Sequence, residues 1–197
     1  MILGITGSFG SGKTTVARIF KSLAGARATV IDADALAHRE LVPGTRTYRK
    51  VIAAFGRGIL KNNVTIDRAA LAKKVFADRH LLNKLMRIVH PGVIRTIRKE
   101  IKDNPAKIII LDAPLLIEAG LHKGVDKLVV VKTGRDKQIK RLSRDRGLER
   151  KGILKRINSQ MPLGKKIRLA DFVIDNNGSI QETRKQAVKI WRLLWKN

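Results

Sequence analysis

The chain has 197 residues, enough to bury a hydrophobic core in one domain, with or without an insertion. Cysteine is absent, which excludes a disulfide scaffold, a thiolate metal site and a cysteine nucleophile. The 42 Lys and Arg residues against 16 Asp and Glu give a formal charge of +26, which favours polyanionic partners. With five Phe, two Trp and one Tyr, a base-stacking surface is not expected. We therefore expect weak nonspecific polyanion binding but no specific nucleic-acid recognition.

No apolar run approaches the roughly 18 residues needed to cross a bilayer. The longest run, at 108–111, has the length of a strand. The N-terminal segment lacks the charged start of a signal peptide, so we expect a soluble, cytoplasmic protein without a membrane partner. The sequence leaves open whether the protein is a monomer or a small homo-oligomer.

Short apolar runs alternate with longer amphipathic stretches, which predicts a parallel sheet covered by helices. The stretch 36–103 has helical spacing, and Pro91 stands at a plausible first position of a helix within it. Near the end of the chain, Ser179 and Glu182 form a capping box that predicts a final helix. On that helix we expect an inward face that places both tryptophans in the core. The expected strands are 2–6, 28–31, 107–112, 127–131 and 172–174, with a helix at 13–23; the inward face comprises Val188, Trp191, Leu194 and Trp195.

These elements predict an α/β fold in one domain, built on a five-stranded parallel sheet. The sequence shows no internal repeat and no linker between the segments. We therefore interpret the long helical stretch as an insertion into that domain. Between the fourth and fifth strands, residues 133–168 hold 13 Lys and Arg against three Asp and Glu. The expected parts are a core of about 1–34, 105–134 and 170–197, an inserted helical region of about 35–104, and a lid of about 135–169.

The segment Gly7–Thr14 satisfies the pattern G-x-x-x-x-G-K-[ST] in full. It follows an apolar strand and precedes a helical pattern, which is the context that this motif requires. Its glycines allow main-chain N–H groups to face phosphate oxygens, and the helix N-terminus adds partial positive charge. Lys13 would reach the terminal phosphates, and the Thr14 hydroxyl would ligate Mg²⁺. The motif therefore predicts a nucleoside triphosphate site.

Three carboxylates lie at or just after the ends of predicted strands, at the edge where open α/β sheets bind ligands. Asp112 ends an apolar strand, as a metal-site acid would, although a turn aspartate before Pro114 is the alternative. Asp32 and Asp34 follow the second strand, where they would meet a metal or a hydroxyl group. One of these two could instead cap a helix at 35–41.

The basic segment between the last two strands corresponds in position to the mobile lid of small-molecule kinases. Arg141 and Arg144 are three residues apart, which puts both on one helix face, where they could clamp phosphates. An exposed charged helix is the alternative. The histidines show no metal-ligand spacing; of the four, His90, before Pro91, is retained as a candidate substrate contact.

The phosphate loop is shared by many protein families. Several further segments, taken in their order along the chain, point to one family more specifically. The chain resembles the dephospho-coenzyme A kinase family along nearly its whole length. The segments that carry the resemblance include the loop ending in Lys13-Thr14-Thr15, 31–34 (Ile-Asp-Ala-Asp), 112–118 (Asp-Ala-Pro-Leu-Leu-Ile-Glu), Gln138 with Arg141, 156–160 (Arg-Ile-Asn-Ser-Gln) and 170–178 (Ala-Asp-Phe-Val-Ile-Asp-Asn-Asn-Gly).

The resemblance implies ATP-dependent phosphorylation of the ribose 3′-hydroxyl of dephospho-CoA, in a fold like that of the nucleoside monophosphate kinases. It implies Asp34 as the general base with Asp32 beside it, and Lys13 and Arg141 on the phosphates. It also places the turn 176–178 against the adenine of ATP. The expected nucleotide contacts are Gly7, Ser8, Phe9, Gly10, Ser11, Gly12, Lys13, Thr14, Thr15, Arg141, Asn176, Asn177 and Gly178; the expected acceptor contacts are Asp32, Asp34, His90, Pro114 and Leu115; Mg²⁺ would be held by Thr14, with Asp32 or Asp112 acting through water.

Two other functions remain open at this stage. A P-loop kinase acting on another nucleoside, nucleotide or small metabolite would share every residue of the phosphate loop. An ATP-gated nucleic-acid-binding protein would account for the charge, and its binding would fall steeply with salt.

Overall fold

The computed structural model describes residues 1–195, which form two compact units. The first unit comprises Met1–Asp32 together with residues 103–195, and the second comprises Ala33–Lys102. None of the helices within residues 1–195 combines the length and the apolar character that a bilayer span requires.

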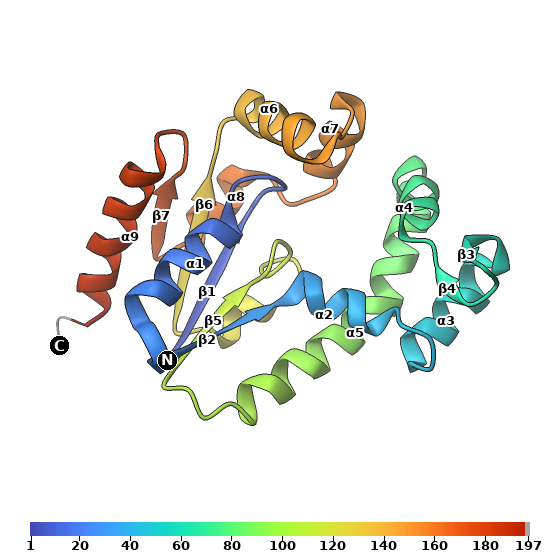
Figure 1. The fold of residues 1–197 in the computed structure, drawn as a ribbon, viewed down its shortest axis with the longest axis horizontal. Coiled ribbons are helices and arrows are strands. Elements are labelled where there is room, and N and C mark those ends of the chain that lie inside the picture. Colours follow the sequence, from blue (N-terminus) through green and yellow to red (C-terminus); the bar gives the residue numbers. More distant parts are fainter. Residues whose placement is uncertain (196–197) are drawn as a thin grey trace. The chain divides into compact units, whose positions relative to one another are not determined.

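The first unit is built on a five-stranded parallel sheet with the strand order β2-β5-β1-β6-β7 (Figure 1). The central strands are buried along nearly their whole length, because helices and loops cover both faces of a parallel sheet. This confirms the predicted fold class. The strands are β1 (Ile2–Gly7), β2 (Ala28–Asp32), β5 (Ile108–Asp112), β6 (Lys127–Lys132) and β7 (Phe172–Asp175).

Helices α1 (Lys13–Ala24) and α9 (Ile180–Leu194) pack against each other and against the core of the sheet (Figure 1). The capping box at Ser179 is present, as predicted. The predicted inward face of α9 is only partly correct: Trp191 packs against the core, but Trp195 ends the helix and is 44% exposed. The buried positions of α9 are Thr183, Ala187 and Ile190, none of which belongs to the predicted face.

Between β6 and β7 the chain forms α6 (Arg135–Arg146), α7 (Arg150–Asn158) and α8 (Leu163–Arg168). Helices α6 and α7 lie side by side beyond the carboxyl end of β6 (Figure 1). They share a small apolar cluster of their own, formed by Ile139, Leu142 and Ile153. Short 3₁₀ turns complete this unit at η1 (Gly25–Arg27) and η3 (Leu121–Gly124).

The second unit consists of four α-helices and a two-stranded hairpin. Pro91 was predicted at the first position of a helix, and this prediction is wrong. The residue lies inside α5. The helix continues through it because Val89, Val93 and Ile97 share one buried face on both sides of the proline, which outweighs the hydrogen bond that proline cannot donate. The elements are α2 (Ala33–Glu40), α3 (Arg46–Phe55), η2 (Arg57–Ile59), β3 (Leu60–Lys61), β4 (Thr65–Ile66), α4 (Arg68–Ala77) and α5 (Arg79–Lys102).

The hairpin β3–β4 lies in a stretch for which only helices were predicted. Its turn contains Asn62 and Asn63, both with positive φ (50° and 56°), a conformation that asparagine tolerates better than most residues. An Asn-Asn pair between short apolar runs was therefore the turn signal that helical spacing concealed.

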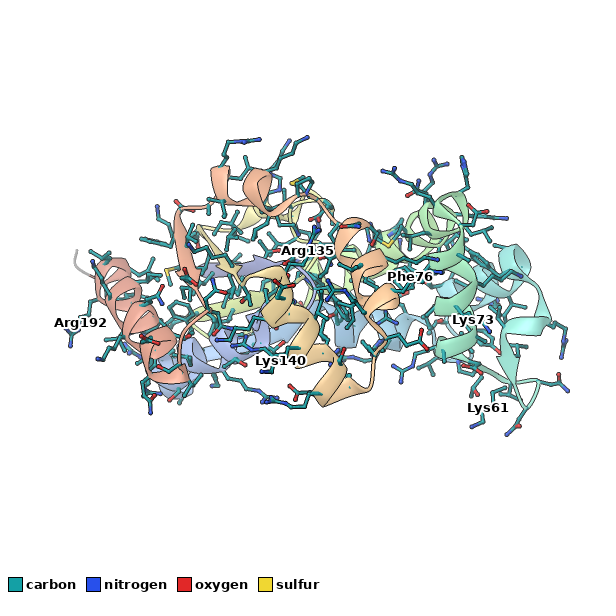
Figure 2. The ribbon with its side chains drawn as sticks, turned by 90° about the horizontal axis from the view of Figure 1, so that it is seen from above. Lys61, Lys73, Phe76, Arg135, Lys140 and Arg192 are labelled. Atoms are coloured by element: carbon teal, nitrogen blue, oxygen red, sulfur yellow. The ribbon has the colours of Figure 1, made fainter. Side chains whose placement is uncertain are left out.

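Basic side chains are exposed on both units (Figure 2). Arg135 and Lys140 on α6, together with Arg192 on α9, illustrate this in the first unit, and Lys61 and Lys73 do so in the second. The charge of +26 is thus spread over the surface of the chain.

Candidate active site

The phosphate loop joins β1 to α1, as the motif predicts. Gly10 and Gly12 have positive φ (77° and 88°), which lets the chain turn sharply into the helix. At Gly12 a Cβ would overlap the Nδ2 atom of Asn176, so this position requires glycine for space as well as for its backbone conformation. The N–H groups that open α1 have no acceptor within the helix and suit an anion. The loop therefore has the local structure of a phosphate site.

Asp112 ends β5 beside the start of α1. Its Oδ2 atom accepts a hydrogen bond of 2.8 Å from the Thr14 hydroxyl, and its side chain is buried. Asp32, at the end of β2, is the register partner of Asp112 in the neighbouring strand. The carboxyl edge of the sheet thus brings two carboxylates and a hydroxyl group together, as the sequence pattern predicts.

Asp34 lies in the first turn of α2, within the second unit. The helix begins at Ala33, two residues earlier than expected, so Asp34 is inside it rather than at the capping position before it. A carboxylate in the first turn is favoured by the partial positive charge of the helix N-terminus. His90 also belongs to the second unit, in the middle of α5.

The base of the phosphate loop is held by residues from the ends of β6 and β7. The main-chain oxygen of Ser11 accepts hydrogen bonds from Thr133 Oγ1 (2.9 Å) and Asn176 Nδ2 (2.8 Å). The amide oxygen of Asn176 in turn accepts from Thr183 on α9 at 2.9 Å. The side chain of Asn176 is therefore occupied in supporting the loop.

Helix α6 carries both Arg141 and Arg144, but the two side chains have different partners. Arg141 donates to the main-chain oxygen of Asn176 (3.2 Å), next to Gly12 of the loop. Arg144 is exposed and pairs with Asp145 at 2.7 Å, an interaction that raises the pKa of Arg144 and lowers the pKa of Asp145. Only Arg141 is thus positioned beside the loop.

The remaining predicted contacts lie around the loop in different environments. Asn177 and Gly178 are exposed, and Asn177 Oδ1 accepts from the Gly134 main chain at 2.7 Å. The Pro114 oxygen accepts from Thr6 Oγ1 of β1 at 3.2 Å, which ties the segment after Asp112 to the central strand. Leu115, next to Pro114, is half-buried.

Lys166 and Glu118 form a buried ion pair that sequence reasoning missed. Lys166 Nζ lies 2.8 Å from Glu118 Oε1 and donates to the Pro114 oxygen at 2.7 Å, with no exposed side-chain surface. Burial lowers the pKa of Lys166, and the nearby charge of Lys13 lowers it further, while Glu118 opposes both effects. No local signal marks this lysine, because it is one of many in a basic helical segment.

Comparison with known proteins identifies the family. The family model for dephospho-CoA kinase matches residues 1–182. The dephospho-CoA kinase of Carboxydothermus hydrogenoformans is 46% identical over 202 residues, and the match covers 100% of this chain and 96% of that protein.

Two solved structures match the fold of this chain over nearly its whole length. A crystal structure from Thermus thermophilus matches with a TM-score of 0.82 and 32% identity, covering 100% of this chain and 98% of that one. The dephospho-CoA kinase of Campylobacter jejuni matches with a TM-score of 0.67 and 27% identity, covering 99% and 97%. The chain therefore belongs to the dephospho-CoA kinase family, whose reaction is the final step of coenzyme A biosynthesis.

Proposed function

We propose that the chain transfers the γ-phosphoryl group of ATP to the ribose 3′-hydroxyl of dephospho-CoA, with the phosphate loop as the ATP site. The observation that carries this proposal is the loop 7–14, folded between β1 and α1, with Thr14 bonded to Asp112. Phosphoryl transfer depends mainly on positioning and on neutralising charge, so no covalent intermediate on the protein is needed. Because ATP is the donor, we expect the enzyme to act in the cytoplasm.

Lys13 and Arg141 are the proposed cationic contacts of the transferring phosphates. Lys13 opens α1 directly after the glycine turn, and Arg141 reaches the same turn from α6. Two fixed cations at the loop would stabilise the charge that spreads over the phosphoryl oxygens in the transition state. The turn 176–178 is the proposed neighbour of the adenine ring, through the exposed residues Asn177 and Gly178.

The oxygen ligands at the sheet edge fit Mg²⁺. This ion binds one or two protein oxygens and completes its shell with water and substrate phosphates. The Thr14 hydroxyl and the Asp112 carboxylate are 2.8 Å apart, and Asp32 is the strand neighbour of Asp112. We propose that Thr14 holds the ion directly and that Asp112 or Asp32 holds it through water. When bound, the ion would neutralise charge on the phosphates.

Asp34 is the proposed general base that accepts the proton of the 3′-hydroxyl, with Asp32 as the alternative. The support is that β2 ends at Asp32 and that Asp34 follows two residues later, at the start of α2. Proton removal by a placed carboxylate typically contributes about 10²–10⁴-fold. His90, Pro114 and Leu115 are the proposed acceptor contacts. We also propose roles for two longer segments of the chain. Residues 35–104 would bind dephospho-CoA, and residues 135–169 would serve as the lid.

The base assignment is tested with Asp34→Asn and Asp32→Asn, which keep the side-chain size and remove the proton acceptor. We expect Asp34→Asn to bind ATP normally and to lose at least about 100-fold in turnover, with a smaller loss for Asp32→Asn. The measurement is steady-state turnover beside ATP titration of each variant. Near-normal turnover of Asp34→Asn would overturn its role as the base.

A further inference from the structure

Phe9, at the tip of the phosphate loop, is bonded through both of its main-chain groups to glutamine side chains. Its N–H donates to Gln160 Oε1 at 2.8 Å, and its oxygen accepts from Gln138 Nε2 at 2.8 Å. Gln138 Nε2 also donates to the Ser8 hydroxyl at 2.5 Å. Gln138 comes from α6 and Gln160 follows α7, so the two ends of this helix pair hold one residue of the loop.

The side chain of Phe9 also contacts the helix pair α6 and α7. It packs against the apolar cluster of α6 and α7, and the Arg156 guanidinium lies 5.2 Å from the centre of its ring. At the next residue, a Cβ on Gly10 would come within 2.6 Å of Leu142 on α6, so the helix and the loop are in close contact. The tip of the loop is thus built into the core of the helix pair and not into the core of the sheet.

We propose that Gln138 and Gln160 are positioning residues that hold the tip of the phosphate loop in its phosphate-binding conformation. This inference rests on the proposed ATP site. A glycine-rich loop with two residues at positive φ loses much conformational freedom when it is ordered. Fixing the tip in advance removes part of that loss from the free energy of nucleotide binding. It also fixes α6, and with it Arg141, relative to the loop.

The two glutamines use opposite ends of their amide groups, which makes the proposal testable atom by atom. Phe9 N–H requires an acceptor, so Gln160 contributes its oxygen; the Phe9 oxygen requires a donor, so Gln138 contributes its nitrogen. A glutamate at position 160 keeps the acceptor. A carboxylate at position 138 instead places an oxygen against the Phe9 oxygen. The substitution of glutamine by glutamate is therefore expected to be tolerated at position 160 and to be harmful at position 138.

The experiment compares Gln138→Met, Gln160→Met, Gln138→Glu and Gln160→Glu with the unmodified chain. Methionine keeps the length of the side chain and removes its hydrogen bond to Phe9, and at position 138 also the bond to Ser8. We measure the Kd for ATP by titration, the KM for each substrate, and the melting temperature. Asp126→Ala is the control, because it removes a side-chain bond to the main chain (2.6 Å, to Ile2 N–H) at the opposite end of β1.

Both methionine variants and Gln138→Glu are expected to weaken ATP binding about tenfold, the equivalent of the one hydrogen bond to Phe9 that each of them loses. Gln160→Glu should restore ATP affinity, and the KM for dephospho-CoA should stay within about twofold throughout. Asp126→Ala should lower the melting temperature without changing the Kd for ATP. The proposal is overturned if Gln160→Glu binds ATP as weakly as Gln160→Met, or if all four variants keep normal ATP affinity. Absence of ATP binding by the unmodified chain would instead overturn the ATP site itself.

Discussion

The buried ion pair between Lys166 and Glu118 makes a quantitative prediction about stability. The Lys166 side chain is fully buried and that of Glu118 is 19% exposed, with 2.8 Å between Nζ and Oε1. The substitution Lys166→Met keeps the apolar stem and removes the charge. It leaves the Glu118 carboxylate with the Met161 N–H as a hydrogen-bond donor and leaves the Pro114 oxygen without its lysine donor.

The expected cost of Lys166→Met is about 3–5 kcal/mol in the free energy of unfolding, since breaking a buried pair leaves one charge uncompensated. That is a large share of the roughly 5–15 kcal/mol that stabilises a typical domain. Combining it with Glu118→Met should recover much of the loss, because two apolar side chains need no charge partner. The cost arises from the unpaired charge, so the two substitutions are not additive.

The assay is urea unfolding followed by circular dichroism, with the four members of the double-mutant cycle measured together. Lys127→Met is the matched control, since Lys127 pairs with Asp171 at 3.2 Å with side chains that are 46% and 37% exposed. It should cost at most about 1 kcal/mol. A comparably small cost for Lys166→Met, or a double variant as unstable as the sum of the single ones, would refute the reasoning.

Three further substitutions test the loop and its neighbours. Gly12→Ala should weaken ATP binding at least about tenfold in titrations, because the residue has φ of 88° and its Cβ would overlap Asn176 Nδ2; unchanged affinity would show that the loop has space there. Lys13→Ala should lower turnover at least about 100-fold through lost charge neutralisation, and a kcat near that of the unmodified chain would contradict its role. Ser179→Ala should lower the free energy of unfolding by about 1 kcal/mol through loss of the capping box with Glu182; an unchanged urea midpoint would be the contrary result.

Local sequence patterns were sufficient to predict the strands of the sheet and the phosphate loop. The strand ending at Asp112 is a continuous apolar run, and the loop 7–14 is a motif whose residues act close together in the chain. Helix α5 was divided at Pro91 because proline usually begins or ends a helix, whereas burial of the face containing Val89 and Val93 keeps it continuous.

The supports of the site depend on tertiary structure and could not be predicted locally. The bonds of Gln138 and Gln160 to Phe9 join residues more than 120 positions apart, and either glutamine alone would suit an exposed helix. The same holds for Lys166, which the sequence does not distinguish from its neighbouring cations. Trp195 was predicted to be buried from helical spacing, but the helix ends at Leu194.

The most direct test of the proposed reaction is turnover of the unmodified chain with ATP and Mg²⁺. Dephospho-CoA is compared with AMP, with adenosine and with no acceptor, and both ADP and CoA are quantified. The proposed function predicts ADP formation that depends on dephospho-CoA, with CoA appearing in equal amount. ADP formation that depends on AMP or adenosine, or that proceeds equally without an acceptor, would contradict it.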